Sequence, residues 1–233
     1  MKKILLTGGS GTLGKEIVKI HKSYGINLEA PSSKQMNITE YENVSRVIDH
    51  VKPEIVIHSA AYTNVRSAEK EIEKLIDVNV LGTINLIKAC HINNIKLVFI
   101  STDHVFDGEK GNYSINDGTN PITKYAKSKA SSELLVRLYD NSLVIRTSFY
   151  GNSFPYEKAF IDQWSSKDYV DIIAPKILDE ALSDKKGIVH CASSRRTIFD
   201  IAKVRNDKIK PITRADIEFP TPKDTSLLIG ENR

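Results

Sequence analysis

Residues 2–14, KKILLTGGSGTLG, determine the fold expected for this 233-residue chain. A short apolar run predicts a strand, and the glycine-rich turn after it leads directly into a helical pattern. The turn satisfies the spacing GxGxxG through Gly9, Gly11 and Gly14, and the spacing GxxGxxG through Gly8, Gly11 and Gly14. Glycines at these positions let backbone N–H groups approach a pyrophosphate at a helix N-terminus. Because the motif joins a strand to a helix, it predicts a dinucleotide-binding βαβ unit.

The rest of the chain repeats this alternation of strand and helix. Short runs rich in Val and Ile, each bounded by turn formers, occur at 2–9, 26–31, 54–61, 96–103, 142–148 and 187–193. Patterns of helical period lie between them at 13–24, 40–51, 68–93 and 124–139. Continuous apolar strands are typical of a parallel sheet buried on both faces. The sequence therefore predicts an α/β protein with a Rossmann-like, doubly wound parallel sheet.

The alternation weakens after about residue 150, where prolines and irregular sequence become frequent. We expect residues 1–151 to form a Rossmann domain for NAD(P), with residues 187–202 returning to its sheet. Residues 152–186 and 203–233 are expected to form a small, abbreviated C-terminal lobe that binds the substrate.

Composition narrows the class of protein. The hydrophobic content is 40%, the charged content is 27% and the formal net charge is +4, with no basic block typical of a nucleic-acid tail. Two cysteines, Cys90 and Cys191, fit buried thiols in a reducing compartment better than a disulfide or a zinc site. The first apolar run is too short for a signal peptide, and no uninterrupted apolar stretch would span a membrane. We expect a cytoplasmic protein without nucleic-acid or membrane partners.

The end of the second apolar run, LEAPSSK at 28–34, bears on the choice of cofactor. NAD-binding folds place an acidic residue here for the ribose hydroxyls, and Glu29 falls slightly early for that role. Ser32, Ser33 and Lys34 could instead receive a 2′-phosphate through hydroxyl donors and one cation. This composition favours NADP, while NAD and a purely structural loop lysine stay open.

Three polar residues form a candidate catalytic set. Thr102 ends the apolar run 96–103, at the edge of a parallel sheet where ligands bind in this architecture. Tyr125 and Lys129 are four residues apart in a helical pattern, so they lie on one helix face. A neighbouring ammonium group is expected to lower the pKa of the phenol, which could then protonate an alkoxide as a hydride reaches a ketone. Thr102 could polarise the same carbonyl oxygen.

The segments TGGSGTLG, IVIHSAAYTNV, VNVLGTINL, ISTDHVFDG, NPITKYAKSK and VIRTSFYG, in this order, resemble the extended short-chain dehydrogenase/reductases. Among these, the chain is most similar to the dTDP-4-dehydrorhamnose reductases. The resemblance covers residues 1–151 and resumes at GIVHCAS, 187–193, and near FPTPKDTSL, 219–227. It implies the catalytic set Thr102, Tyr125 and Lys129. It also implies that the cofactor is bound by Gly8, Gly11, Thr12, Leu13, Gly14, Ser32, Ser33, Lys34, Asn37, Ala60, Ala61, Tyr62, Asn79, Tyr125 and Lys129. The substrate contacts that it implies are His104, Phe106 and Arg146.

Several residues allow a plainer interpretation. Asn79 could bend a helix or satisfy a polar partner, His58 fits a core histidine, and Arg146 could form a structural ion pair. His104 differs from the family pattern, in which dehydratases have glutamate and the reductases generally have tyrosine. Of the glutamates that bind magnesium in some relatives, only Glu16 matches by position, so we expect no metal.

Two functions follow as hypotheses. The first is an NADP-dependent reductase of a nucleotide-linked 4-keto-6-deoxy sugar, most simply converting dTDP-4-dehydrorhamnose to dTDP-rhamnose, with a homodimer as an open alternative to a monomer. The second is a non-catalytic NADP-binding regulatory subunit that acts through a protein partner. The abbreviated segment between Gly151 and Lys186 favours the second, and the intact catalytic set favours the first.

Overall fold

Six parallel strands form the central sheet of the computed structural model, which describes residues 1–218 and 221–230. Residues 219–220 and 231–233 of the expected lobe lie outside this range. In chain order the strands are β1 (Lys3–Thr7), β2 (Asn27–Glu29), β3 (Ile55–His58), β4 (Lys96–Thr102), β5 (Ser142–Thr147) and β10 (Gly187–Cys191). Their order across the sheet is β10-β5-β4-β3-β1-β2, and every pairing is parallel. The predicted Rossmann-like, doubly wound sheet is confirmed.

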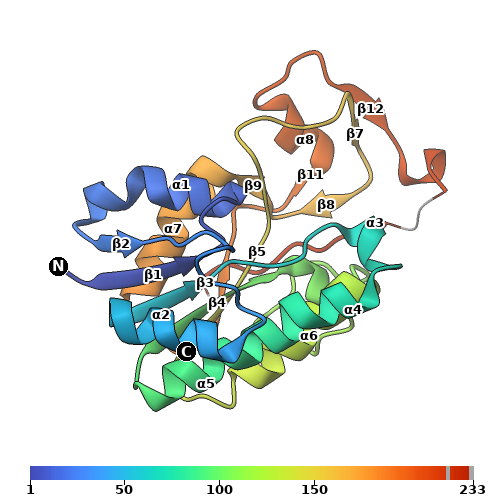
Figure 1. Ribbon diagram of the computed structural model, residues 1–233. Helices are drawn as coiled ribbons and strands as arrows, with labels where there is room; N and C mark the ends of the chain where they lie inside the picture. Colours follow the sequence, from blue (N-terminus) through green and yellow to red (C-terminus); the bar gives the residue numbers. More distant parts are fainter. Residues whose placement is uncertain (219–220, 231–233) are drawn as a thin grey trace.

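Helices cover both faces of this sheet (Figure 1). One face packs against α1 (Thr12–Ile20) and α7 (Val170–Leu182); the other packs against α2 (Tyr41–Val51), α5 (Gly82–Ile92) and α6 (Lys124–Val136). Successive side chains of a strand point to opposite faces, so Leu6 joins the first layer and Leu5 the second. Because both layers exclude water, strands such as β5 are buried along their whole length, which explains their continuous apolar sequence.

The predicted helix at 68–93 is divided. A short helix α3 (Val65–Ala68) precedes α4 (Ile72–Leu75), which continues through a π-helical segment η2 (Ile76–Leu81) into α5. Within the described residues, Ile72–Ile92 is the one helical stretch long and apolar enough to cross a membrane. Core helices meet the same criterion, and Leu75 and Leu86 of this stretch are fully buried in the fold.

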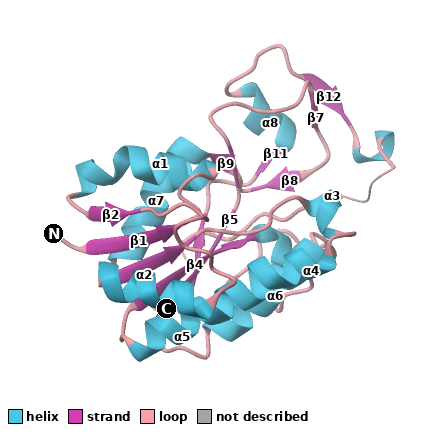
Figure 2. Cartoon of the chain, viewed as in Figure 1, coloured by secondary structure: helices cyan, strands magenta, loops and turns pink. Residues whose placement is uncertain are grey.

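The C-terminal part adds short elements beyond the end of the sheet, on the upper right of Figure 2. They are β6 (Phe149–Tyr150), β7 (Lys158–Phe160), β8 (Trp164–Ser165), β9 (Asp168–Tyr169), β11 (Arg196–Thr197), α8 (Ile198–Lys203), β12 (Lys210–Ile212) and η4 (Arg214–Asp216). β7 pairs with β12, β8 with β11 and β6 with β9. A separate hydrophobic cluster, including Phe154, Tyr169 and Ile201, holds these elements together.

The position of α7 bears on the expected domain division. This helix lies inside the range 152–186 that we assigned to the lobe, but Val170, Ile173 and Ile177 belong to the same hydrophobic cluster as the sheet. We therefore propose that α7 be counted with the Rossmann domain and that the lobe be confined to the short elements around it.

Candidate active site

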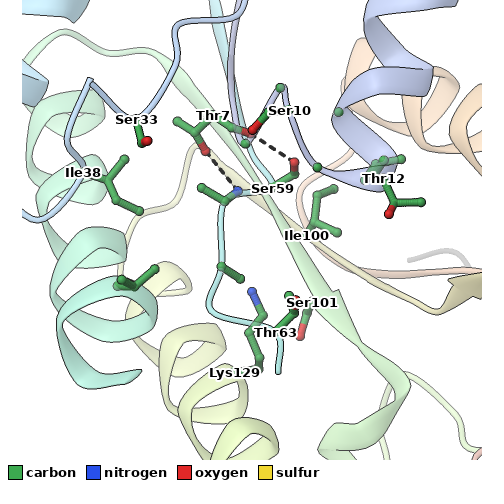
Figure 3. Close-up of a pocket in the computed structure, with 18 of the residues that line it drawn as sticks. Thr7, Ser10, Thr12, Ser33, Ile38, Ser59, Thr63, Ile100, Ser101 and Lys129 are labelled. Atoms are coloured by element: carbon green, nitrogen blue, oxygen red, sulfur yellow. Dashed lines mark hydrogen bonds between the residues drawn. The ribbon is translucent and has the colours of Figure 1, made fainter. Parts of the chain in front are cut away.

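A cavity of about 600 Å³ opens at the carboxyl ends of the sheet strands, beside the glycine turn. It brings together most of the residues that the sequence indicated for the cofactor and the catalytic set. Those that line it are Gly8, Gly11, Thr12, Leu13, Gly14, Ser33, Asn37, Ala60, Ala61, Thr102, Tyr125 and Lys129. Figure 3 shows Lys129 pointing from its helix toward the centre of this space, with Thr63 and Ser101 near its side chain.

The glycine turn is packed too closely for side chains. A Cβ atom on Gly8, which has φ +75°, would lie 2.7 Å from the backbone nitrogen of Ala60, and one on Gly14 would lie 2.2 Å from the carbonyl oxygen of Gly8. Helix α1 starts after Gly11, which has no side chain to cap the helix, and its first turn contains no acidic residue. The N–H groups of this turn are therefore available to an anion, as a pyrophosphate requires.

The expected 2′-phosphate site is only partly formed by the predicted residues. Ser33 and Asn37 line the cavity, whereas Ser32 and Lys34 do not. The hydroxyl of Ser32 donates to the side-chain oxygen of Gln35 at 2.8 Å, which turns it toward its own loop. Among the described residues that line the cavity there is no Asp or Glu, and Glu29 is exposed outside it. A carboxylate near Ser33 and Asn37 would repel a 2′-phosphate, so its absence from the cavity lining suits a phosphorylated ribose.

The three candidate catalytic residues meet at one wall of the cavity. Thr102 is the last residue of β4, and Tyr125 and Lys129 lie one turn apart at the start of α6, whose N-cap is Thr123. The hydroxyl groups of Thr102 and Tyr125 are hydrogen-bonded to each other. The backbone N–H of His104 donates to Thr102 Oγ1 at 3.1 Å, which fixes the threonine rotamer.

The charges at this wall differ from the sequence-based expectation. Burial raises the pKa of Tyr125 well above 10, the nearby Asp103 carboxylate raises it further, and only the hydrogen bond with Thr102 opposes them. Burial lowers the pKa of Lys129 to about 7, while Glu133 acts in the opposite direction. The expectation that Lys129 lowers the pKa of the phenol was wrong, because loss of solvent dominates at this buried site. The phenol therefore keeps its proton at neutral pH.

Asn79 and Tyr62 are not among the residues that line the cavity. Asn79 is 2% exposed in the π-helical segment, and its side chain is fully used within the protein. Its Oδ1 accepts from the backbone N–H of Tyr62 at 2.7 Å, and its Nδ2 donates to Tyr62 O at 3.2 Å and to Ser128 Oγ at 2.9 Å. The asparagine thus ties the loop after β3 to α6, as the plainer interpretation allowed.

His58 is a buried histidine whose two ring nitrogens both have partners. Thr7 Oγ1 lies 2.8 Å from Nδ1, and Thr83 Oγ1 lies 3.1 Å from Nε2. The same Thr7 hydroxyl accepts from the backbone N–H of Ala60, at 3.2 Å (Figure 3). Burial, with a contribution from Lys129, lowers the pKa of His58 to about 3. A neutral, fully bonded ring is a structural support of the cavity rather than a base.

Two of the three expected substrate contacts lie elsewhere. Phe106 is 2% exposed and stacks on Tyr113 with ring centroids 4.1 Å apart. Arg146 is 3% exposed and is paired with Glu133 at 2.8 Å, so the alternative of a structural ion pair describes it correctly. The guanidinium uses Nε and Nη2 for Glu133 and lies outside the cavity that holds Thr102, Tyr125 and Lys129.

His104 lines a second cavity of about 580 Å³, between the sheet edge and the lobe. Aromatic and basic residues dominate its walls, including Tyr150, Tyr156, Trp164 and Lys167. The buried Asp103 carboxylate lies between the two cavities. It is hydrogen-bonded to Thr102, which lines the first cavity, and accepts from Thr225 Oγ1, which lines the second, at 2.9 Å. Of the residues that line the second cavity the sequence indicated only His104, since the short lobe strands show no periodic pattern. Among the described residues no His, Cys, Asp and Glu cluster could hold a metal.

Comparison with known proteins places this site in a family. Residues 1–174 match the family model described as RmlD substrate binding domain. The dTDP-4-dehydrorhamnose reductase of Aggregatibacter actinomycetemcomitans is 36% identical over 184 residues, which are 76% of this chain and 62% of that relative. The spore coat polysaccharide biosynthesis protein SpsK of Bacillus subtilis is 34% identical over 212 residues, which are 83% of this chain and 74% of that relative.

A solved structure has the same fold over almost the whole chain. The dTDP-4-dehydrorhamnose reductase of Bacillus anthracis, in complex with NADP, superposes with a TM-score of 0.88 at 27% identity, over 99% of this chain and 92% of that one. The first relative named above is matched over less than two thirds of its length. The chain belongs to the family of the RmlD substrate binding domain, within the extended short-chain dehydrogenase/reductases.

Proposed function

We propose that this protein is an NADP-dependent reductase of a nucleotide-linked 4-keto-6-deoxy sugar, and that its substrate is dTDP-4-dehydrorhamnose. The observation that supports this most is the meeting of Thr102, Tyr125 and Lys129 on the wall of the cavity that begins at the glycine turn. The named reductase relatives and the NADP complex of the Bacillus anthracis enzyme support the same reaction and cofactor.

The residues present fit a dinucleotide. The close-packed turn at Gly8 and Gly14 exposes the first N–H groups of α1, and Ser33 and Asn37 border the far end of the cavity. Lys129 is the only cation among the described residues that line it, and it would hold the ribose next to the nicotinamide. When bound, NADPH supplies the hydride for the reduction.

The chain's own groups then handle the oxygen and its proton. Thr102 donates a hydrogen bond to the substrate carbonyl and polarises it, and Tyr125 gives its proton to the oxygen as the carbonyl becomes an alcohol. Because burial raises the pKa of Tyr125, the proton is present at neutral pH whenever substrate arrives. General acid assistance of this kind contributes roughly 10²–10⁴-fold to the rate.

The second cavity is the proposed place for the nucleotide-sugar. His104 faces it directly after Thr102 and Asp103, so a sugar bound there would approach the catalytic wall. Its aromatic walls suit a base and a sugar ring, and Lys167, whose pKa is raised by Tyr150, Asp103 and Tyr156 despite burial, supplies a positive charge for a diphosphate. A homodimer and a cytoplasmic location remain predictions from the sequence.

The variant Tyr125→Phe tests the proposal. We expect NADPH oxidation, followed by absorbance with dTDP-, UDP- and GDP-linked 4-keto sugars, to fall by roughly 10²–10⁴-fold, because the proton donor is lost. The dissociation constant for NADPH should change little. Tyr41→Phe, on helix α2, is the matched control because Tyr41 lines neither cavity, and it should keep the wild-type rate.

Two results would contradict the proposal. If Tyr125→Phe reduces the substrate at the wild-type rate, the proton donor has been misassigned. If the wild-type protein binds NADPH and oxidises it with none of the sugars, the non-catalytic regulatory subunit becomes the better hypothesis.

A further inference from the structure

A buried ion pair lies one helical turn beyond Lys129 along α6. Glu133 follows Lys129 by one helical turn on α6 and is 2% exposed. Arg146 of β5 donates from Nε to both carboxylate oxygens at 3.1 Å and from Nη2 to Oε2 at 2.8 Å. Ser101 Oγ donates to Oε1 of the same carboxylate. Three elements of the fold thus fix one carboxylate beside the catalytic lysine.

A buried ion pair is a costly way to stabilise a protein. Removing two charges from water costs several kcal/mol per ion, and apolar residues of similar size often replace such a pair without loss. This pair is also incompletely satisfied, because Nη1 of Arg146 is buried without a hydrogen-bond partner. The position of the pair indicates a functional role instead. Ser101, which donates to Glu133, precedes Thr102 and also lines the cavity.

The surroundings of Lys129 leave Glu133 as its source of negative charge. The ammonium lies 3.8 Å from the centroid of the Phe99 ring, on β4. From β3 it is faced by His58, which is neutral above pH 4 because burial lowers its pKa to about 3. Tyr125 on the same helix keeps its proton, and Arg146 on β5 is positive. Asp103, at the end of β4, acts on Tyr125. Burial lowers the pKa of Lys129 to about 7, and the Glu133 carboxylate opposes this shift.

We propose that Glu133 is a positioning residue for the reduction: its carboxylate, held by Arg146 and Ser101 one helical turn from Lys129, keeps the ammonium of Lys129 positively charged for the cofactor. This inference rests on the function proposed above. It concerns the part of the site that binds the cofactor, so it can be tested by NADPH binding without any sugar substrate. Arg146 and Ser101 act through Glu133 and touch neither cofactor nor substrate in this role, although Ser101 borders the cavity.

NADPH binding as a function of pH tests this proposal. The dissociation constant is measured by cofactor fluorescence between pH 5.5 and 9 for the wild type and for Glu133→Gln. This substitution keeps the shape of the side chain, removes its charge and replaces one of its two accepting oxygens by an NH2 group. In the wild type, affinity should fall as pH rises through about 7, where Lys129 loses its proton. In Glu133→Gln this midpoint should move down by about one pH unit. At pH 7 the charged fraction of Lys129 then drops from about half to about one tenth, so binding weakens about fivefold.

Three further variants make the result specific. Lys129→Met removes the ammonium group. Any pH dependence of NADPH affinity that this variant still shows belongs to the phosphate of the cofactor and is subtracted from the wild-type profile. Glu133→Asp restores the charge and should return the midpoint toward that of the wild type. Asp171→Asn is the matched control, because Asp171 forms a two-point pair with Arg205 far from Lys129, at 2.7 and 2.8 Å, and should leave the midpoint unchanged.

Stability must be separated from this effect. If Glu133→Gln leaves Arg146 unpaired and does not fold, the double variant Glu133→Gln/Arg146→Met removes both charges and should fold with the same lowered midpoint. A folded variant of either kind with the wild-type midpoint would overturn the proposal, as would an unchanged pH profile in Lys129→Met. A wild type that shows this profile yet reduces no nucleotide sugar would refute the proposed function and leave the role of Glu133 intact.

Discussion

Replacing Gly14 by alanine tests whether the glycine turn is built around a phosphate. The added Cβ would lie 2.2 Å from the carbonyl oxygen of Gly8 and 2.6 Å from the Cα of Gly9, whereas real Cβ atoms essentially never approach other atoms within 3.0 Å. Both neighbours are backbone, so the turn must retreat by most of an ångström. A hydrogen bond to a phosphate is worth about 1.5–3 kcal/mol and fails at that displacement.

The expected result is a loss of NADPH affinity by about 10- to 150-fold for each hydrogen bond broken, with about 1–3 kcal/mol lost from the free energy of unfolding. Fluorescence titration measures the first quantity and urea denaturation the second. Gly118→Ala is the matched control, because a Cβ there would meet no atom within 4 Å. Wild-type affinity in folded Gly14→Ala would refute the placement of the pyrophosphate at this turn.

Three more predictions concern stability and reactivity. Arg146→Ala leaves the Glu133 carboxylate buried and unpaired, so urea denaturation should show a loss of about 3–5 kcal/mol; a loss below 1 kcal/mol would contradict the buried pair. Burial lowers the pKa of His58 to about 3 in the folded state, against 6.5 when unfolded, so the unfolded chain takes up the proton first and stability falls as pH drops below 6.5. Between pH 6.5 and 4.5 the wild type should lose about 2 kcal/mol more than His58→Gln, and equal losses would argue against a neutral buried ring. Burial raises the pKa of Cys90 and of Cys191 to about 12, so neither should react with a thiol reagent at pH 8 until the protein is unfolded; rapid labelling of the native protein would show that a thiol is accessible.

Local sequence was sufficient where a backbone requirement or a repeating pattern decides the structure. The six predicted strands all occur in the sheet. For β3, β4 and β5 the reason is that a strand buried on both faces must be apolar along its length. The turn at Gly8 and Gly14 could be predicted for a similar reason: no other residue fits where the backbone approaches so closely. The spacing of Tyr125 and Lys129 placed both on one face of α6.

Side-chain environment could not be predicted in the same way. The sequence assigned Asn79 and Tyr62 to the cofactor, but the π-helical segment turns Asn79 toward Ser128 and the backbone of Tyr62. Phe106 and Arg146 were expected at the substrate and are buried instead. The short strands of the lobe have too few residues to show a period, so the second cavity stayed hidden until they were brought together.

The sequence by itself determined the layered sheet, the phosphate turn and the presence of a tyrosine, a lysine and a threonine at the strand ends, since each depends on residues close together in the chain. Only the tertiary structure decided the charges of that set. Burial in the folded protein raises the pKa of Tyr125 and lowers that of Lys129. The Glu133 carboxylate opposes the shift of Lys129. Solvation and long-range pairing set these values, and both depend on segments that meet only when the chain is folded.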